Sequence, residues 1–265
     1  MSGSASQASV EYDGAVAVLR FKNDPSGVIS TKGAAQLSEA IEGLLRETSV
    51  RALVLTGATP GVFIRHADVS QILRAGEALA ANRIAPEDFL TSPFLRLSRL
   101  CESSPVPIIA AINGVCMGGG LEIALCCTYR IAGNAVGQIG LPEIRLDIFP
   151  GLGGMRRLAH LIGEHQARAF VLRGAVVAAQ QALSIGLVDE ITDSAVSRAM
   201  ELAHELAGRS PAAIRAIMGS AQFADPCAAE REQVVKFAAL LRDHPDIRNR
   251  LREFIASGHE LEAIP

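Results

Sequence analysis

The sequence is poor in aromatic residues, contains no tryptophan, and has no apolar run long enough to cross a membrane. Phe, Trp and Tyr make up 4% of the 265 residues, whereas a membrane-spanning helix needs about 20 mostly apolar residues in a row. The net charge is −3 and no basic stripe occurs, so nothing favours nucleic-acid binding. Residues 1–9 have neither a basic nor an apolar segment, and we expect a disordered tail there, not a signal peptide.

Cysteine is scarce too, and its pattern excludes a disulfide framework. The five cysteines, an odd number without a C-x-x-C pair, are Cys101, Cys116, Cys126, Cys127 and Cys227. Most have apolar neighbours, which is typical of reduced cysteine that serves as a small hydrophobic residue in the cytoplasm. We therefore expect a cytoplasmic protein with no metal site. A chain of this length buries about three quarters of the surface that its unfolded form exposes, so it needs no disulfide or metal to be stable.

The most informative stretch is a glycine-rich turn after an apolar run. Residues 106–112 predict a buried strand, and residues 113–120 end in three glycines before a helix predicted from Leu121. Glycine lets the backbone approach a ligand, and the first turn of a helix has N–H groups without intrahelical partners. With Glu122 beside it, the turn can stabilise a developing negative charge. Alternatively, such a turn serves only close packing, with the Glu favoured by the helix dipole.

Strand and helix patterns alternate over the first two hundred residues, and only helices are predicted after them. Strands are expected as a hairpin over 10–21 and at 51–56, 106–112, 129–132, 137–140 and 187–191. Helices are expected at 31–48, over 69–100 with breaks at Gly76 and Pro86, from 121 onward, at 155–162, in a second helix that ends at 172, and at 178–183. From 193 onward the chain is predicted to be helical, with breaks near 208–211, 225–226 and 244–245. This order predicts an α/β core followed by a helical region, with the boundary near residue 205.

Several stretches carry a resemblance to one family. They are residues 51–57 with Ala67 and Asp68, residues 107–122, residues 141–154 and residues 172–191. In order, spacing and residue type, residues 10–205 resemble the enoyl-CoA hydratase/isomerase (crotonase) family, and the tail resembles it loosely. The resemblance implies an α/β spiral of repeated ββα units, with a C-terminal helical region over 206–265 that serves oligomerisation and covers the site. It also implies a homotrimer or a hexamer.

Apolar residues of the C-terminal helices support self-association, because they exceed what one face of a small bundle needs. They are Leu206, Ile214, Ile217, Val234, Val235, Leu240 and Leu241.

The resemblance also implies an active site. The backbone N–H groups of Ala67 and Gly119 would form an oxyanion hole for a thioester carbonyl, and Glu122 and Glu143 match the two glutamates of the family's hydratases. Two carboxylates can hold one water, one removing its proton and the other protonating the α-carbon. The implied substrate is an acyl-CoA, so coenzyme A would enter as part of the substrate and no cofactor would stay bound permanently. Residues expected to contact the substrate or CoA are Arg65, His66, Asp68, Val69, Ser70, Gly118, Gly120 and Gly151.

Some positions depart from the family pattern, mainly by loss of positive charge. Arg65 and His66 replace an Ala-Gly pair, Ser70 stands where Lys is frequent, the neutral residues 254–258 replace a basic tail, and the usual Asn-Ala pair near residue 28 is missing. Fewer cations favour a substrate without CoA, although Arg65 could supply one charge. We expect His66 to pack beside the oxyanion loop, and not to act as a catalyst.

Two further residues near the matched motifs have a functional and a structural interpretation. Asp147 could be a third carboxylate of the pocket, and the interpretation that we adopt is an exposed or helix-ending Asp. Cys116 is expected to be a small residue in the wall of the site and not a nucleophile, because no paired base is visible.

The main hypothesis is therefore an enoyl-CoA hydratase-like lyase that adds water to a 2-enoyl-CoA. An isomerase or a β-dicarbonyl (C–C) hydrolase of the same family is the alternative, and a non-catalytic scaffold with the same fold is a third. Isomerisation needs only one carboxylate, so the presence of Glu122 and Glu143 favours hydration. The three consecutive glycines beside this pair argue against a scaffold.

Overall fold

Two β-sheets form the centre of the molecule. The structure is a computed structural model that describes residues 7–23, 26–220 and 226–260. The larger sheet has the order β1-β2-β3-β5-β7-β10, with strands β1 (Ala8–Asp13), β2 (Val16–Phe21), β3 (Ala52–Gly57), β5 (Ile108–Ile112), β7 (Tyr129–Gly133) and β10 (Glu190–Thr192). The smaller has the order β4-β6-β8-β9, with strands β4 (Val62–Ile64), β6 (Val115–Met117), β8 (Ile139–Gly140) and β9 (Val176–Val177).

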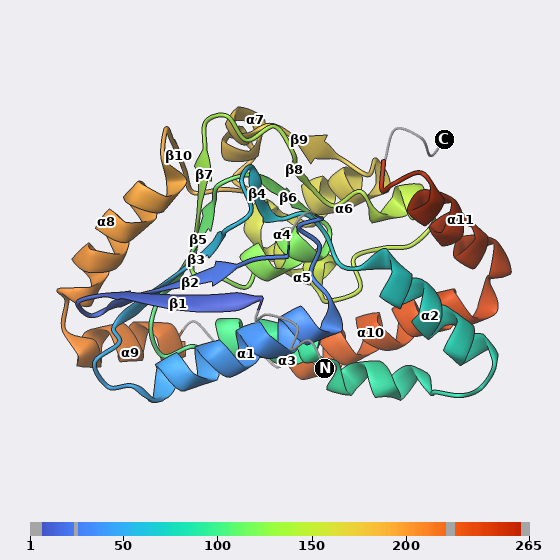
Figure 1. The fold of residues 1–265 in the computed structure, drawn as a ribbon, viewed down its shortest axis with the longest axis horizontal. Helices are drawn as coiled ribbons and strands as arrows, with labels where there is room; N and C mark the ends of the chain where they lie inside the picture. The colour runs from blue at the N-terminus through green and yellow to red at the C-terminus, as the bar shows by residue number, and fades with distance from the viewer. Residues whose placement is uncertain (1–6, 24–25, 221–225, 261–265) are drawn as a thin grey trace, which may run out of the picture.

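From β3 to β8, successive strands alternate between the two sheets, which makes this part of the chain a spiral (Figure 1). Strands β3, β5 and β7 are parallel neighbours in the larger sheet, and the strands that follow each of them, β4, β6 and β8, are parallel neighbours in the smaller one. Strands β1 and β2 form the predicted antiparallel hairpin. The α/β spiral of ββα units that the resemblance implies is confirmed.

Helices cover both faces of the larger sheet because its strands are apolar on both sides. In β2, Ala17 and Leu19 join the core under α1 (Thr31–Arg46) and α3 (Pro93–Glu102), whereas Val16 and Val18 pack toward α8 (Ala195–Ala207). The N-cap of helix α1 is Ser30, whose Oγ accepts from the N–H of Gly33 at 3.1 Å. Helix α4 (Gly119–Ala124) follows β6, and helix α7 (Ala179–Ser184) follows β9. Helices α5 (Gly154–Ile162) and α6 (Glu164–Leu172) lie between β8 and β9 in the chain.

A second lobe is built from helices that lie beside the spiral, on the right in Figure 1. Its members are α2 (Val69–Ala80), α10 (Pro226–Asp243) and α11 (Pro245–Ala256), with the short helices η1 (Pro86–Thr91) and η2 (Glu143–Leu146) at its border. Their apolar side chains share one cluster, which includes Leu79, Phe237, Leu241, Leu251 and Phe254. Helix α9 (Pro211–Ser220) lies apart from this lobe, beside α8.

Several element boundaries differ from the predictions. Helix α2 continues through Gly76, where a break was expected, because Gly76 lies against Leu241 and Arg248 and this packing outweighs a helix penalty of about 1 kcal/mol. The extra strand β6 interrupts the expected glycine turn. Strand β1 begins at Ala8, so residues 8 and 9 do not belong to a tail; residues 1–6 lie outside the described residues. The last strand begins at Glu190 instead of residue 187. The breaks near 208–211 and 244–245 in the C-terminal helices are confirmed, whereas the break predicted at 225–226 adjoins residues 221–225, which lie outside the described residues.

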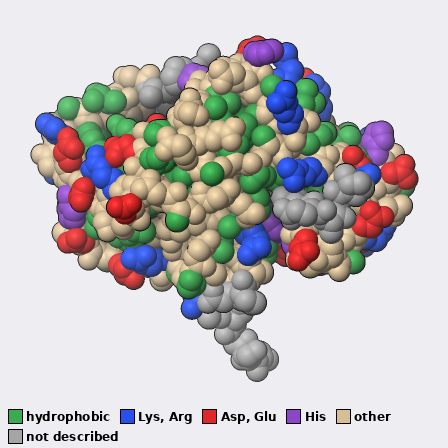
Figure 2. Space-filling view, turned by 90° about the horizontal axis from the view of Figure 1, so that it is seen from above, with side chains coloured by type: hydrophobic (Ala, Val, Ile, Leu, Met, Phe, Trp, Pro, Cys, Tyr) green, Lys and Arg blue, Asp and Glu red, His purple; other side chains and the backbone are tan. Residues whose placement is uncertain are grey.

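Within the described part of the chain, no helix is long and apolar enough to cross a membrane. On the face in Figure 2, positive and negative side chains are interspersed, without a patch of one sign.

Candidate active site

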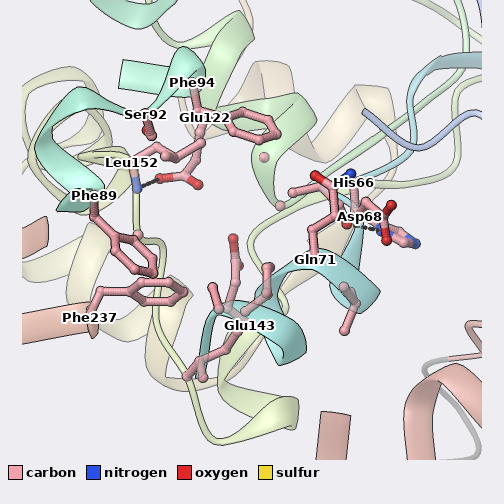
Figure 3. Close-up of a pocket in the computed structure, with 18 of the residues that line it drawn as sticks. His66, Asp68, Gln71, Phe89, Ser92, Phe94, Glu122, Glu143, Leu152 and Phe237 are labelled. Carbon is pink, nitrogen blue, oxygen red and sulfur yellow. Dashed lines mark hydrogen bonds between the residues drawn. The ribbon is translucent and has the colours of Figure 1, made fainter. Parts of the chain in front are cut away.

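A cavity of about 310 Å³ lies between the spiral and the second lobe. Its wall includes Ala67, Gly118, Gly119, Glu122 and Glu143 from the matched motifs, together with side chains of α2, η1, α10 and α11. Figure 3 shows Glu122 and Glu143 pointing into the same space, with Phe89 and Phe237 on one side of it and His66, Asp68 and Gln71 on the other. The fold therefore gathers residues from distant parts of the chain around one cavity.

Ala67 and Gly119, whose backbone N–H groups are the predicted oxyanion hole, lie side by side in the wall of this cavity. The peptides on either side of Ala67 are fixed, since the N–H of Ile29 donates to His66 O and the N–H of Asp68 donates to Ile29 O. A Cβ placed on Gly119 would lie only 3.3 Å from the nitrogen of Ala67. Among the described residues, neither N–H has an acceptor. Two adjacent N–H groups without partners are a suitable oxyanion hole.

The glycines around Gly119 allow this approach. Gly118 has a φ of 49°, in the region that only glycine enters easily. A Cβ on Gly120 would lie 2.0 Å from the carbonyl oxygen of Ile64, so Gly120 serves the packing of α4 on β4 and does not line the cavity.

Glu122 is buried and held by backbone donors. Its Oε1 accepts from the N–H of Leu152 at 2.8 Å (Figure 3) and from the N–H of Gly154 at 2.9 Å. Burial raises the pKa of the Glu122 carboxyl, whereas these two hydrogen bonds and the positive charge of Arg157 act in the opposite direction. The pKa remains raised, but the donors and Arg157 favour the ionised form relative to burial alone.

Glu143 has less support. Its Oε2 is buried, and no described residue donates to it. Burial raises the pKa of Glu143 well above its usual range, the negative charge of Glu122 raises it further, and only a hydrogen bond with its own backbone acts in the opposite direction. Because Glu122 has two backbone donors and a nearby positive charge, we assign the proton of the pair to Glu143 and the charge to Glu122.

His66 lines the cavity beside Ala67 and is a packed, neutral side chain. Its Nδ1 donates to Ala67 O at 2.7 Å, and its ring stacks on that of His259 with centroids 5.3 Å apart. Phe254 completes a cluster of three rings. Burial lowers the pKa of His66 to about 4, so the ring is uncharged near neutral pH.

The other predicted contact residues divide into two groups. Asp68, Val69 and Gly151 line the cavity, although Asp68 is also the N-cap of α2 and accepts from the N–H of Ser70. Arg65 and Ser70 do not line it. Nε of Arg65 is buried without a partner among the described residues.

Asp147 and Cys116 do not take part in the site. Asp147 is exposed, ends η2 and pairs with Arg250 at 2.6 Å, which confirms its structural interpretation. Cys116 lies in the hydrophobic core, so our placement of it in the wall of the cavity was wrong, and burial raises the pKa of its thiol. Cys101, Cys126 and Cys127 are likewise buried free thiols. No group of three or more potential metal ligands occurs within the described residues.

Sequence reasoning missed one side of the cavity and the donors to Glu122. Phe89 (η1), Phe149 and Phe237 (α10) pack edge to face, with centroids of Phe237 6.3 Å from Phe89 and 5.7 Å from Phe149. No periodic pattern connects three elements so far apart. The donors come from the turn at Leu152 to Gly154, whose glycines were the available signal.

Comparison with known proteins shows the family to which the chain belongs. The model of the enoyl-CoA hydratase/isomerase family matches residues 11–255. The chain is 35% identical to YngF of Bacillus subtilis (strain 168), which carries the family's name, over 192 residues, covering 72% of this chain and 71% of YngF. The solved structure of carnitinyl-CoA hydratase from Mycobacterium avium is similar with a TM-score of 0.81 and 26% identity, over 96% of this chain and 97% of that one. The chain belongs to the enoyl-CoA hydratase/isomerase family, a family of enzymes.

A larger relative shares only one part with this chain. The fatty acid oxidation complex subunit alpha of Shewanella halifaxensis (strain HAW-EB4) is 31% identical over 199 residues, which are 75% of this chain and 27% of that protein. The match thus spans about a quarter of the length of that relative.

Proposed function

We propose that this protein adds water to the double bond of a 2-enoyl-CoA thioester. The observation that supports this most is the pair of carboxyls with unlike environments. Two backbone donors stabilise Glu122 as a carboxylate, whereas the buried Oε2 of Glu143 has no donor among the described residues. In the proposal, Glu143 therefore carries the proton of the pair. Hydration needs one group of each kind at the same double bond.

In the proposed reaction, the thioester carbonyl accepts from the N–H groups of Ala67 and Gly119. Glu122 takes a proton from water while the water oxygen bonds to the β-carbon, and the electrons of the double bond move onto the carbonyl oxygen. The two N–H groups stabilise that enolate, a contribution worth on the order of 10²–10³ in rate per donor. Glu143 then gives its proton to the α-carbon. Proton exchange with solvent returns Glu122 to the carboxylate and Glu143 to the acid.

The two sides of the cavity suit the two parts of such a substrate. The acyl chain would lie against the apolar side, which is formed by Ile72, Ile84, Phe89, Phe149, Val234 and Phe237. The side with Thr31, His66, Asp68 and Gln71 is more polar and would receive the pantetheine part. Arg65, next to this side, is the candidate to supply a positive charge to a phosphate. CoA thus belongs to the substrate in this proposal, and no permanently bound cofactor is required.

The test is the separate removal of each carboxyl charge. We expect Glu122→Gln and Glu143→Gln each to lower the turnover of a 2-enoyl-CoA by at least about 10² with the fold intact. Asp147→Asn is the matched control, because Asp147 is an exposed carboxylate outside the cavity whose left-handed backbone conformation Asn tolerates. Its turnover should stay within about twofold of the wild type. Loss of activity in the Glu143 variant alone would instead indicate an isomerase, which needs a single carboxylate.

A further inference from the structure

The turn that holds Glu122 is itself held by a buried arginine. Nη1 of Arg157, in α5, donates to the carbonyl oxygen of Leu152, the residue whose N–H donates to Glu122. A Cβ on Gly153 would lie 2.8 Å from the same Nη1, so the guanidinium lies directly against this turn. Arg157 is thus one residue removed from the carboxylate and lies outside the cavity.

Glu102, at the end of α3, fixes the guanidinium. Nε of Arg157 donates to its Oε1 at 2.8 Å and Nη2 donates to its Oε2 at 2.9 Å, so the contact is bidentate. The side chain of Arg157 is 3% exposed. The neighbouring Arg156 also donates to Glu102, at 2.7 Å, but its side chain is 26% exposed and, among the described residues, it makes no hydrogen bond to the turn. Bidentate pairs restrict orientation strongly.

We propose that Arg157, oriented by Glu102, is a positioning residue for Glu122: it fixes the turn that donates to this carboxylate and places a positive charge behind it. The inference rests on the proposed function, in which the ionised Glu122 removes a proton from water. It assigns a role to a pair of residues that do not touch the substrate.

The charges around Glu122 determine the sign of the expected effect. Arg157 faces it from α5, Glu143 from η2, and the thiol of Cys126 donates to its backbone carbonyl from the residues after α4, while Glu102 lies beyond Arg157. Arg157 is the one positive group of this set, and its charge lowers the pKa of Glu122. Without it, burial and Glu143 act unopposed by any charge, so the pKa of Glu122 rises.

The experiment compares two adjacent arginines. In the substrate-free full-length protein, the Glu122 carboxyl is titrated by its ¹³C resonance, assigned through its loss in Glu122→Gln, and hydration of a 2-enoyl-CoA is followed against pH. Arg157→Met should raise the pKa of Glu122, move the acid limb of the kcat profile to higher pH, and lower kcat at neutral pH by about ten- to a hundredfold, as misplaced groups do. Arg156→Met should leave both readouts close to the wild type.

Two further variants separate the effect of the orientation of Arg157 from the effect of its charge on Glu122. Glu102→Gln keeps the charge of Arg157 but weakens its anchor, so kcat should fall without an upward shift of the Glu122 pKa. The double variant Arg157→Met/Glu102→Met removes both charges, so neither is left buried without its partner, and we expect it to fold even if Arg157→Met does not. It should show the same raised pKa of Glu122.

Equal effects of the Arg157 and Arg156 variants would overturn the proposal, and so would a loss of rate in Arg157→Met with an unmoved Glu122 resonance. The titration needs no substrate. A protein that hydrates no enoyl thioester but shows the raised pKa would therefore contradict the proposed function and not the positioning by Arg157.

Discussion

At the scale of single residues, the site depends on two glutamate carboxyls that have different hydrogen-bond donors and charges around them. Glu122 receives two N–H donors and lies near a positive charge, whereas Oε2 of Glu143 has no donor among the described residues. Burial raises the pKa of both carboxyls, but the donors and Arg157 offset this effect in part at Glu122, so Glu143 holds its proton more tightly. Such a difference gives an acid and a base at one pH without any difference in residue type.

The unsupported carboxyl should reduce the stability of the folded protein at neutral pH. The folded-state pKa of Glu143 is raised above its unfolded value, so the folded state binds the proton more tightly and loses stability as pH rises above about 4.3, the unfolded value. We expect Glu143→Gln to raise the melting temperature at pH 7 by at least about 2 °C, or about 1 kcal/mol at this chain length. Thermal melts from pH 4 to 8 measure it.

The stabilisation by Glu143→Gln should vanish toward pH 4, and Asp147→Asn should show no comparable trend. A Glu143→Gln variant that is less stable than the wild type at every pH would show that the carboxyl is paired after all.

At the scale of elements, the cavity depends on contacts between the spiral and the second lobe. The glycine turn, the segment after β4, and η2 bring the polar groups, whereas η1 and α10 bring the aromatic side that the acyl chain would contact. Phe237 is the central ring of that side, since it packs against Phe89, Phe149 and the backbone of Gly151. Substrate preference should therefore reside in a helix far from the catalytic motifs in sequence.

Replacing Phe237 by alanine tests whether the aromatic side of the cavity binds the acyl chain. Phe237→Ala should raise KM for 2-enoyl-CoAs of medium and long chain by about tenfold or more, because burial of an apolar group is worth about 1.5–3 kcal/mol. The kcat should change little, since the contact is equal in ground and transition states. A four-carbon substrate, too short to reach this ring, is the internal control. An equal rise of KM for every chain length would contradict the assignment of this side to the acyl chain.

The parts of the site that the sequence predicts are those encoded locally. Glu122 stands in the first turn after three glycines and Glu143 follows a Leu-Pro pair, so residue type and spacing suffice. The pair of Arg157 and Glu102 joins α5 to α3 across 55 positions, and such a contact leaves no periodic pattern. Strand β6 was not predicted for a similar reason: its three residues form a strand only because they pair with β4 and β8, which lie far away in the sequence.

At the scale of the whole molecule, the helical C-terminal region has two different parts. Val234 and Leu241 of α10 are buried within their own chain, so they are not surplus apolar residues. Helix α9, in contrast, has no buried residue, and Ile217 on it is 64% exposed. An exposed apolar helix favours an interface between copies of the chain.

We predict a homotrimer or a hexamer that uses this surface. Ile217→Glu should weaken the assembly, because a charge at an apolar contact must be desolvated, whereas Arg215→Ala on the same helix should not. Light scattering at micromolar concentration measures both. A monomeric wild type under these conditions would contradict the prediction.

The central claim is the addition of water to a 2-enoyl thioester, and isotopic labelling tests it most directly. In H₂¹⁸O, mass spectrometry of the product should show one ¹⁸O at the β-carbon, and in D₂O one deuterium at the α-carbon. Both labels should disappear with the turnover of Glu122→Gln and Glu143→Gln. A shifted double bond with deuterium but no ¹⁸O, a cleaved carbon–carbon bond, or an unchanged thioester would contradict hydration.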